Sequence, residues 1–349
     1  MRRFLNLLNG PRTLGRGLQF WVGFCVVFVI AASMPTFTDS FAVTNLTFFL
    51  VWTFMALGLS VMWGYGGILS FGQTAFFGLA GYTYGVVSIN LGDAHGLTWV
   101  ALLVALLLPV LLALVLGYFM FYGGIRDVFV GIVTLSVTLV FETFMAQTAG
   151  PEWTIGDARL NGFNGMSGMP PLTINGGESN LIFDGPPLYW FVLALVLVCY
   201  LGLRLLVNSR FGRVLVAIRG NPDRVEMLGY NVRMYQLSAF AIGGGMAGLS
   251  GVLYTLWGAY ITPSSMGLNA AALPIIWVAA GGRKDLTAVL VATVALTWVS
   301  QQLAIYGNQY ALILMGFLLL CVVLGAPEGF VVSLVMFFKR KLALRKQLA

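Results

Sequence analysis

The sequence predicts an all-α protein, a polytopic helical membrane protein that crosses the bilayer about ten times. Its first basis is composition: 59% of the 349 residues are hydrophobic and only 9% are charged, whereas soluble domains are roughly 45–50% apolar and about 25% charged. The second is that the apolar residues form long continuous runs, not the short alternating segments of a membrane barrel. These two observations exclude a soluble enzyme, a disordered chain and a disulfide scaffold.

The spans follow from length, because a helix needs about 20 mostly apolar residues to cross the hydrocarbon core. Ten runs qualify: Leu18–Met34, Val43–Trp63, Leu69–Asn90, Thr98–Phe121, Val128–Ala146, Leu188–Leu206, Leu237–Trp257, Gly267–Gly281, Thr287–Ile305 and Gln309–Gly325. The short run Gly267–Gly281 and the glycine-rich run Leu69–Asn90 could each be a broken or re-entrant helix that lines a cavity. A total of eight spans therefore remains open.

The distribution of basic residues orients these spans, since cytoplasmic loops retain Lys and Arg. With both termini inside, every one of the 19 Lys and Arg residues except Arg159 falls on the inner side or at a span end beside it. The net charge of +7 is thus explained by topology, and it does not indicate a nucleic-acid partner. We predict one transmembrane domain over 1–349, with an outer, periplasmic loop at 148–187, an inner, cytoplasmic loop at 207–235 and a basic inner tail at 339–349.

Residues for catalysis are scarce. The chain has one histidine, His95, and its cysteines Cys25, Cys199 and Cys321 stand apart inside apolar runs. It lacks the phosphate-binding pattern G-x-x-x-x-G-K-[ST], as well as the HExxH and GxSxG patterns of hydrolases. We therefore predict no catalytic residue, no metal site and no cofactor in this chain.

The inner loop contains the clearest local signal. Asn221 is a good N-cap, Pro222 suits the first helical position, Asp223 complements the helix dipole, and Gly229 is a natural stop. This predicts a short helix over Pro222–Leu228. Such a helix suits either a docking surface for a soluble partner or a membrane-surface helix held by anionic lipid.

Polar residues inside or beside the apolar runs are candidates for a solute pathway. Glu142 is the only acid well inside a run, where it either serves the pathway or pairs locally near the outer end of its helix. Gln73, Thr74 and Asn164 are further candidates. Clustered glycines at 64–81 and 243–251 allow helices to approach closely, which indicates packing first and movement beside a pathway second.

Several segments together resemble the permeases of ABC importers for branched-chain amino acids, whose relatives carry urea and short amides. They are Leu69–Tyr82, Gly162–Pro171, Ser209–Arg213, Ala217–Arg219, Leu228–Val232, Ala247–Gly251, Gly281–Gly282 and Pro327–Gly329. The resemblance covers residues 43–335, and the order of segments is similar to that of the M-type subunit. The sequence departs from the family pattern after Gly281-Gly282, where the family often has GG-x-G and this chain has Arg283-Lys-Asp. It also has Leu139 where a glutamate is common.

This resemblance implies a division of labour. Two permease subunits form the pathway, two cytoplasmic ATPase subunits bind the ATP, a periplasmic binding protein delivers the solute, and lipid of the bacterial inner membrane surrounds the permeases. It implies that the inner loop couples to the ATPases through Arg213, Arg219, Asn221, Pro222, Asp223, Glu226 and Gly229. The main alternative is a secondary transporter that uses Glu142 and an ion gradient.

Overall fold

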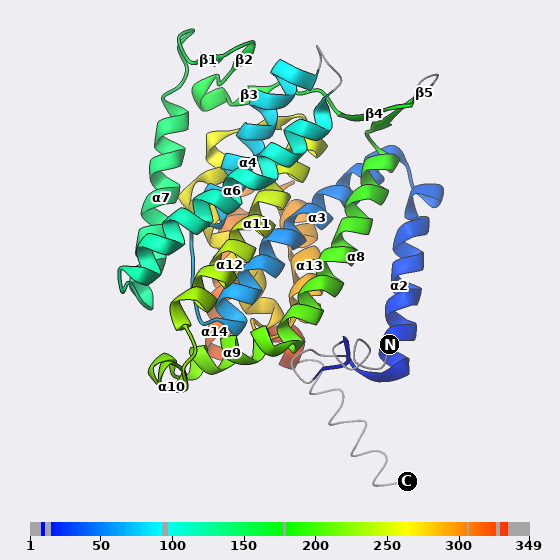
Figure 1. Cartoon of the computed structure of the whole chain (residues 1–349). Coiled ribbons are helices and arrows are strands. Elements are labelled where there is room, and N and C mark those ends of the chain that lie inside the picture. The colour runs from blue at the N-terminus through cyan, green and yellow to red at the C-terminus, as the bar shows by residue number, and fades with distance from the viewer. Residues whose placement is uncertain are drawn as a thin grey trace.

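A computed structural model describes residues 8–10, 15–92, 97–176, 179–305, 307–325 and 329–333; the predicted tail 339–349 lies outside them. Each of the ten predicted runs corresponds to one helix in Figure 1. These helices are α2 (Gly17–Phe37), α3 (Ser40–Leu59), α4 (Gln73–Val87), α6 (Thr98–Tyr122), α7 (Val128–Ala146), α8 (Pro186–Asn208), α11 (Val232–Gly258), α12 (Leu268–Gly281), α13 (Leu286–Ala304) and α14 (Asn308–Gly325).

The polytopic helical class is confirmed. Within the described ranges, seven helices are long and apolar enough to cross a membrane: α2, α3 with its continuation η1 (Ser60–Tyr65), α6, α7, α8, α11 and α13. By contrast, α12 has 14 residues and is about 21 Å long at 1.5 Å per residue, short of the ~30 Å hydrocarbon core. Helix α4 has 15 residues and continues without a gap into the π-helical turn η2 (Ser88–Gly92). The number of complete spans stays a prediction.

Helix α11 is the centre of the bundle and packs against α3, α4 and α6 (Figure 1). Its glycines make this possible. A Cβ atom at Gly251 would lie 2.9 Å from the Cα of Phe77 in α4, and one at Gly248 would overlap Pro109 in α6. The glycine cluster 243–251 therefore serves close packing, since no larger residue would fit between these backbones.

The two ends of the bundle differ in structure. One end, which we call the basic end, carries Arg126, Arg283, and two short helices, α9 (Arg210–Gly220) and α10 (Pro222–Met227). The opposite, strand end carries the long connection before α8 (Figure 1). That connection forms β1 (Thr154–Ile155), β2 (Ala158–Arg159), the 3-10 turn η3 (Gly162–Asn164), β3 (Met166–Ser167), β4 (Leu172–Gly176) and β5 (Ser179–Phe183).

The strands form three antiparallel pairs: β1 with β2, β4 with β5, and β3 with β6 (Tyr260–Ile261). The last pair joins Met166 to Ile261 and Ser167 to Tyr260, which lie almost a hundred residues apart in sequence. It anchors the long connection to the end of α11, just before the 3-10 turn η4 (Pro263–Met266). The described part of the predicted outer loop 148–187 therefore folds as a cap on this end of the bundle.

The predicted span Leu69–Asn90 is not broken along its length: its helix begins late, at Gln73, and runs through α4 and η2 to Gly92. The irregular backbone precedes this helix, in residues 66–72, which we call the broken segment. After α3 and η1 the chain turns back at Gly67, whose φ of 77° is costly for any residue with a side chain. It then runs without regular helix to Gly72, the N-cap of α4. The backbone amide of Phe71 donates to Thr134 Oγ1 (3.1 Å), and Thr138 Oγ1 donates to Phe71 O (3.2 Å). Because these threonines lie in the middle of α7, α4 begins about halfway through the bundle.

Candidate functional site

The four predicted pathway residues come together in one region, between the strand end and the middle of the bundle. Asn164 is exposed in η3, which contacts η4. Glu142 lies one turn before the end of α7, and Thr74 and Gln73 lie in the first turn of α4. Helices α4 and α7 both contact η4. The four residues therefore lie on elements that all contact η4, although Gln73 and Asn164 are far apart in the sequence.

Gln73 is almost completely buried, as is Thr74 beside it. Its Nε2 donates to the thioether of Met62 (3.2 Å), and its Oε1 has no hydrogen-bond partner. A thioether is a weak acceptor, and a buried amide oxygen without a partner costs about 1–3 kcal/mol. Packing alone would favour an apolar side chain here, so this amide is a strong candidate for contact with a passing polar solute.

Thr74 and Glu142 flank the junction between η4 and α12. Thr74 Oγ1 donates to Met266 O (3.3 Å), and a Cβ atom at Gly267 would lie 2.6 Å from Glu142 Oε1. Gly267 is the N-cap of α12. A carboxylate beside a helix N-terminus is stabilised by the helix dipole, so the position of Glu142 supports the local, structural interpretation of this acid.

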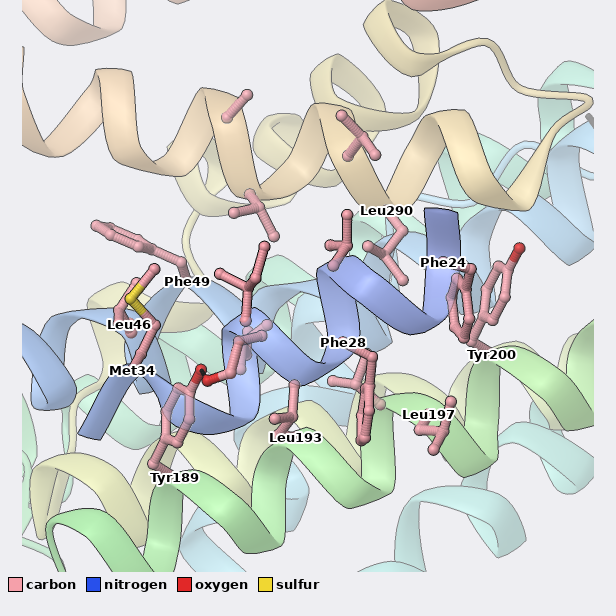
Figure 2. A pocket seen from close by; sticks show the side chains of 18 residues that line it. Phe24, Phe28, Met34, Leu46, Phe49, Tyr189, Leu193, Leu197, Tyr200 and Leu290 are labelled. Carbon is pink, nitrogen blue, oxygen red and sulfur yellow. Dashed lines mark hydrogen bonds between the residues drawn. The ribbon is translucent and has the colours of Figure 1, made fainter. Parts of the chain in front are cut away.

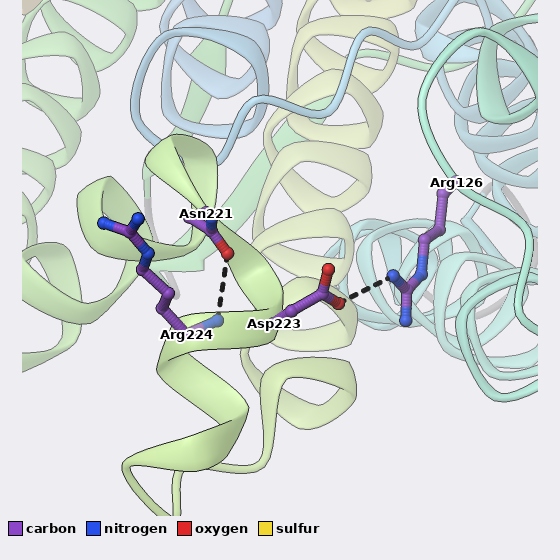
Figure 3. A network of polar contacts seen from close by, with 4 residues as sticks. All are labelled: Arg126, Asn221, Asp223 and Arg224. Carbon is purple, nitrogen blue, oxygen red and sulfur yellow. Dashed lines mark hydrogen bonds and ion pairs between the residues drawn. The ribbon is translucent and has the colours of Figure 1, made fainter.

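The second region is a folded module at the basic end, formed by α9 and α10. The predicted helix is confirmed to within one residue: α10 covers Pro222–Met227, Asn221 Oδ1 accepts from Arg224 N (2.9 Å), and Gly229 has a φ of 86°. Asp223 forms an ion pair with Arg126 at 3.1 Å, from the loop before α7 (Figure 3). Helix α9 was not predicted, although Ser209 caps it by accepting from Phe211 N.

This module has a small core and an exposed rim. Val214, Ile218, Val225 and Val232 pack together as its core. A cavity of about 510 Å³ beside that core is lined by Arg210, Arg213, Val214, Ala217, Val225, Leu228, Tyr230 and Tyr235. Met227 and Leu228 at the end of α10 are 87% and 75% exposed. Arg213, Asp223 and Glu226 are exposed too, so most of the predicted coupling residues share one accessible surface.

Arg219 is the exception, because it points into the bundle. Its Nη1 donates to the carbonyl oxygen of Gly64 in η1, and its stem packs against Gly67. Burial, followed by the nearby charge of Arg283, lowers the pKa of Arg219. On the other side of η1, Ser60 Oγ donates to Arg283 O (3.1 Å) and Tyr65 Oη donates to Lys284 O (3.0 Å). The start of the broken segment is thus held between α9 and the α12–α13 turn.

Sequence reasoning missed the partners that hold the broken segment. Thr134 and Thr138 were not singled out, although hydroxyl residues four apart on an apolar run share one helix face. The roles of Ser60 and the carbonyl of Arg283 had no local signal, because the donor and acceptor lie 223 residues apart. Within the described ranges, no group of three or more His, Cys, Asp or Glu residues could hold a metal ion.

A helical bundle that holds buried polar groups and irregular backbone at membrane depth is an architecture of membrane transport proteins. Residues 41–323 match the family described as branched-chain amino acid transport system, permease component, and the chain belongs to that family. It is a multi-pass membrane permease, and the permeases of this family are transport subunits rather than enzymes.

Three relatives illustrate the likeness. The chain is 26% identical to the high-affinity branched-chain amino acid transport system permease protein LivM of Escherichia coli (strain K12), over 93% of this chain and 79% of that protein. The protein of the same name from Salmonella typhimurium is also 26% identical, over 86% and 72%. The probable branched-chain amino acid transport permease protein LivM of Methanocaldococcus jannaschii is 24% identical, over 82% and 92%. No solved structure matches the chain.

Proposed function

We propose that this chain is one of two permease subunits in an ATP-driven importer of branched-chain or other hydrophobic amino acids. It resides in the bacterial inner membrane and works with two cytoplasmic ATPase subunits and a periplasmic binding protein. ATP is bound by the ATPase subunits, and this chain needs no cofactor of its own. The names of the three relatives, all branched-chain amino acid permeases, support the substrate class.

The observation that carries the proposal is the α9–α10 module. A connection between two helices needs only a few residues, yet this one folds around its own core and exposes Met227 and Leu228 at its tip. Exposed apolar residues within a charged rim are typical of a protein-binding surface. With the termini inside, this surface faces the cytoplasm, where the ATPase subunits are.

Arg219 supports a route by which docking reaches the pathway. A displacement of α9 would pull on the Gly64 carbonyl and hence on the segment that leads to Gln73 and Thr74. Gly66, Gly67 and Gly72 leave that segment free to change its backbone angles. The α9–α10 module therefore has two separate roles: the surface around Met227 docks the ATPase subunits, and Arg219 connects α9 to the Gly64 carbonyl.

The test replaces one exposed apolar residue at each end of the bundle by glutamate, in separate variants. Met227→Glu should abolish co-purification of the ATPase subunits and ATP-dependent uptake of leucine in proteoliposomes. Phe163→Glu, the matched control, alters an exposed residue at the strand end and should leave co-purification intact. Asp223→Lys should also uncouple transport. Undiminished ATPase binding and uptake in both Met227→Glu and Asp223→Lys would refute the docking role.

Two alternatives make different predictions. A urea or short-amide importer would keep the same ATPase docking, but its binding protein would be stabilised by urea and not by leucine. An ion-coupled transporter would catalyse gradient-driven uptake with the purified chain alone, and Glu142→Gln would abolish that uptake. The proposal requires that the chain alone catalyse no uptake and no ATP hydrolysis.

A further inference from the structure

A cavity of about 470 Å³ lies between α2, α3, α8 and α13, away from both regions described above (Figure 2). Its lining is apolar from end to end and includes Phe28, Phe49, Leu193, Val196 and Val294. The only polar side-chain groups among the lining residues are the hydroxyls of Tyr189 and Tyr200. Tyr189 donates to Ala31 O (2.7 Å), and Tyr200 Oη is shared with Thr287 Oγ1 (2.8 Å) and Arg204 Nη1 (2.7 Å). The cavity therefore offers no unpaired polar side chain to a ligand.

Hydrogen bonds fasten α2 to α8 near its two ends, and the cavity lies beside the part of α2 between them. Near its C-terminal end, Tyr189 Oη and Trp190 Nε1 of α8 donate to the carbonyls of Ala31 and Ala32. At its beginning, the buried Arg204 of α8 donates to Gly15 O, and Phe24 stacks on Tyr200 with ring centroids 5.4 Å apart. None of the residues of α2 is fully buried. Between the two anchors only Phe28 is partly buried, where it packs against the cluster of Val43, Tyr189 and Leu193.

The cavity opens on the side of the bundle that faces away from the core. Val27 and Ile30 of α2 and Val291 of α13 line it and are each at least half exposed. These residues belong to helices that are apolar enough to span the membrane. The opening between α2 and α13 therefore lies at the level of the lipid tails.

We infer that this cavity binds an acyl chain of a membrane phospholipid. A dry void would leave its lining without van der Waals partners on one side, and water needs polar groups that this lining does not provide. A zwitterionic amino acid would be desolvated with no partner for either charge. A flexible hydrocarbon chain makes van der Waals contacts with the apolar lining, and the surrounding bilayer supplies such chains in excess.

A helix of a second protein is a poorer occupant. A helix with its side chains is about 10–12 Å across, so it could reach the cavity floor only by separating α2 from α8 and breaking the hydrogen bonds at Ala31 and Ala32. A single acyl chain is narrower and can enter between Val27 and Val291 while both anchors stay in place. The bound chain would then fill the gap under α2 and fix its distance from α8 and α13.

The test uses the full chain in nanodiscs of phosphatidylethanolamine and phosphatidylglycerol, with a trace of a phospholipid that carries a photoactivatable diazirine on its acyl chain. Val291→Trp narrows the opening, and it starts from an exposed residue, so it leaves the core undisturbed. Leu193→Trp fills the cavity from inside. Val198→Trp is the matched control, because Val198 is an exposed residue of α8 that does not line the cavity.

We expect cross-links to cavity residues such as Leu193 and Val294 in the wild type and in Val198→Trp, and at least a tenfold loss of them in Val291→Trp and Leu193→Trp. Native mass spectrometry in mild detergent should show a retained phospholipid in the first two proteins only. Cross-links confined to outward residues of α2 in the wild type would overturn the inference, even if a variant fails to fold. Equal retention of phospholipid in all four proteins would also overturn the inference. So would a loss of labelling at the cavity residues on binding of a second permease subunit, because that subunit would then be the occupant of the cavity.

Discussion

At the scale of single residues, Gln73 shows a conflict between stability and function. Its amide is buried with one oxygen unpartnered, whereas Gln301 in α13 donates its Nε2 to Asn45 Oδ1 at 2.8 Å. The two glutamines are thus a matched pair, one poorly satisfied and one paired. A replacement by methionine keeps the length of the side chain and removes its amide in both cases.

We predict that Gln73→Met leaves the thermal stability unchanged or raises it, by up to about 1 kcal/mol, because it removes an unsatisfied buried group. Transport by the assembled importer should fall at least tenfold. Gln301→Met should instead lower the stability by about 1 kcal/mol, since it breaks a hydrogen bond. Thermal unfolding in detergent and leucine uptake in proteoliposomes measure both effects; a Gln73→Met protein with normal uptake would remove Gln73 from the pathway.

Two aspartates illustrate how the surroundings of a carboxylate determine its contribution to the stability of the fold. Asp223 pairs with Arg126 at the surface, where both side chains are mostly exposed. Asp285 is buried at the start of α13 and accepts from Ala288 N at 2.8 Å. We predict that Asp223→Ala changes the free energy of unfolding by less than about 0.5 kcal/mol and that Asp285→Ala lowers it by about 1–2 kcal/mol. Denaturation of both variants measures this difference. An equal or larger loss of unfolding free energy in Asp223→Ala than in Asp285→Ala would contradict the prediction.

At the scale of elements, the decisive feature is the path from α3 through η1 and the broken segment into α4. A π-helical turn such as η1 is rare and often marks a functional position. Here it is followed by an irregular backbone, which a bundle tolerates at membrane depth only when protein groups satisfy it. The hydroxyls of Thr134 and Thr138 supply part of that satisfaction, and Arg219 ties the other end to α9.

We predict that Arg219→Ala uncouples the importer: the ATPase subunits should still co-purify and hydrolyse ATP, while uptake falls at least tenfold. Arg219→Lys should restore part of the uptake, because an ammonium group can still donate to the Gly64 carbonyl. This pattern differs from that of Met227→Glu, in which docking itself is lost. If Arg219→Ala takes up as much leucine per ATP hydrolysed as the wild type, the contact between Arg219 and Gly64 does not transmit movement of α9.

At the scale of the whole molecule, close packing around α11 determines whether the bundle forms at all. Gly251 of α11 lies against the backbone of Phe77, whereas a Cβ atom at Gly202, on the surface of α8, would meet nothing within 4 Å. Both glycines are in helices, so both carry the same intrinsic cost relative to alanine. Only their tertiary surroundings differ.

We therefore expect Gly251→Ala to lower the yield of folded protein severely, because the added methyl group would force α11 and α4 apart. Gly202→Ala should raise the stability by about 0.5–1 kcal/mol. Size-exclusion profiles and thermal unfolding compare the two variants directly. A folded and stable Gly251→Ala protein would contradict the packing described for α11.

Properties that depend on neighbouring residues were predictable from the sequence. Hydrophobic runs placed the helices because a bilayer requires about 20 apolar residues for a span. The helix α10 was predicted to within a residue because capping by Asn221 and the reversal at Gly229 are local interactions. The resemblance of short segments also indicated the family, which the match over residues 41–323 confirms.

The remaining features depended on contacts between distant residues, which only the tertiary structure reveals. The sequence by itself determined a helical membrane bundle with a capped basic loop. The tertiary structure decided that Thr74 and Glu142 both lie against the η4–α12 junction and that Arg219 turns inward to Gly64. It also decided that an apolar cavity lies between α2 and the rest of the bundle. The physical reason is that hydrophobicity and capping act over a few residues, whereas buried polar contacts and cavities result from how whole helices fit together.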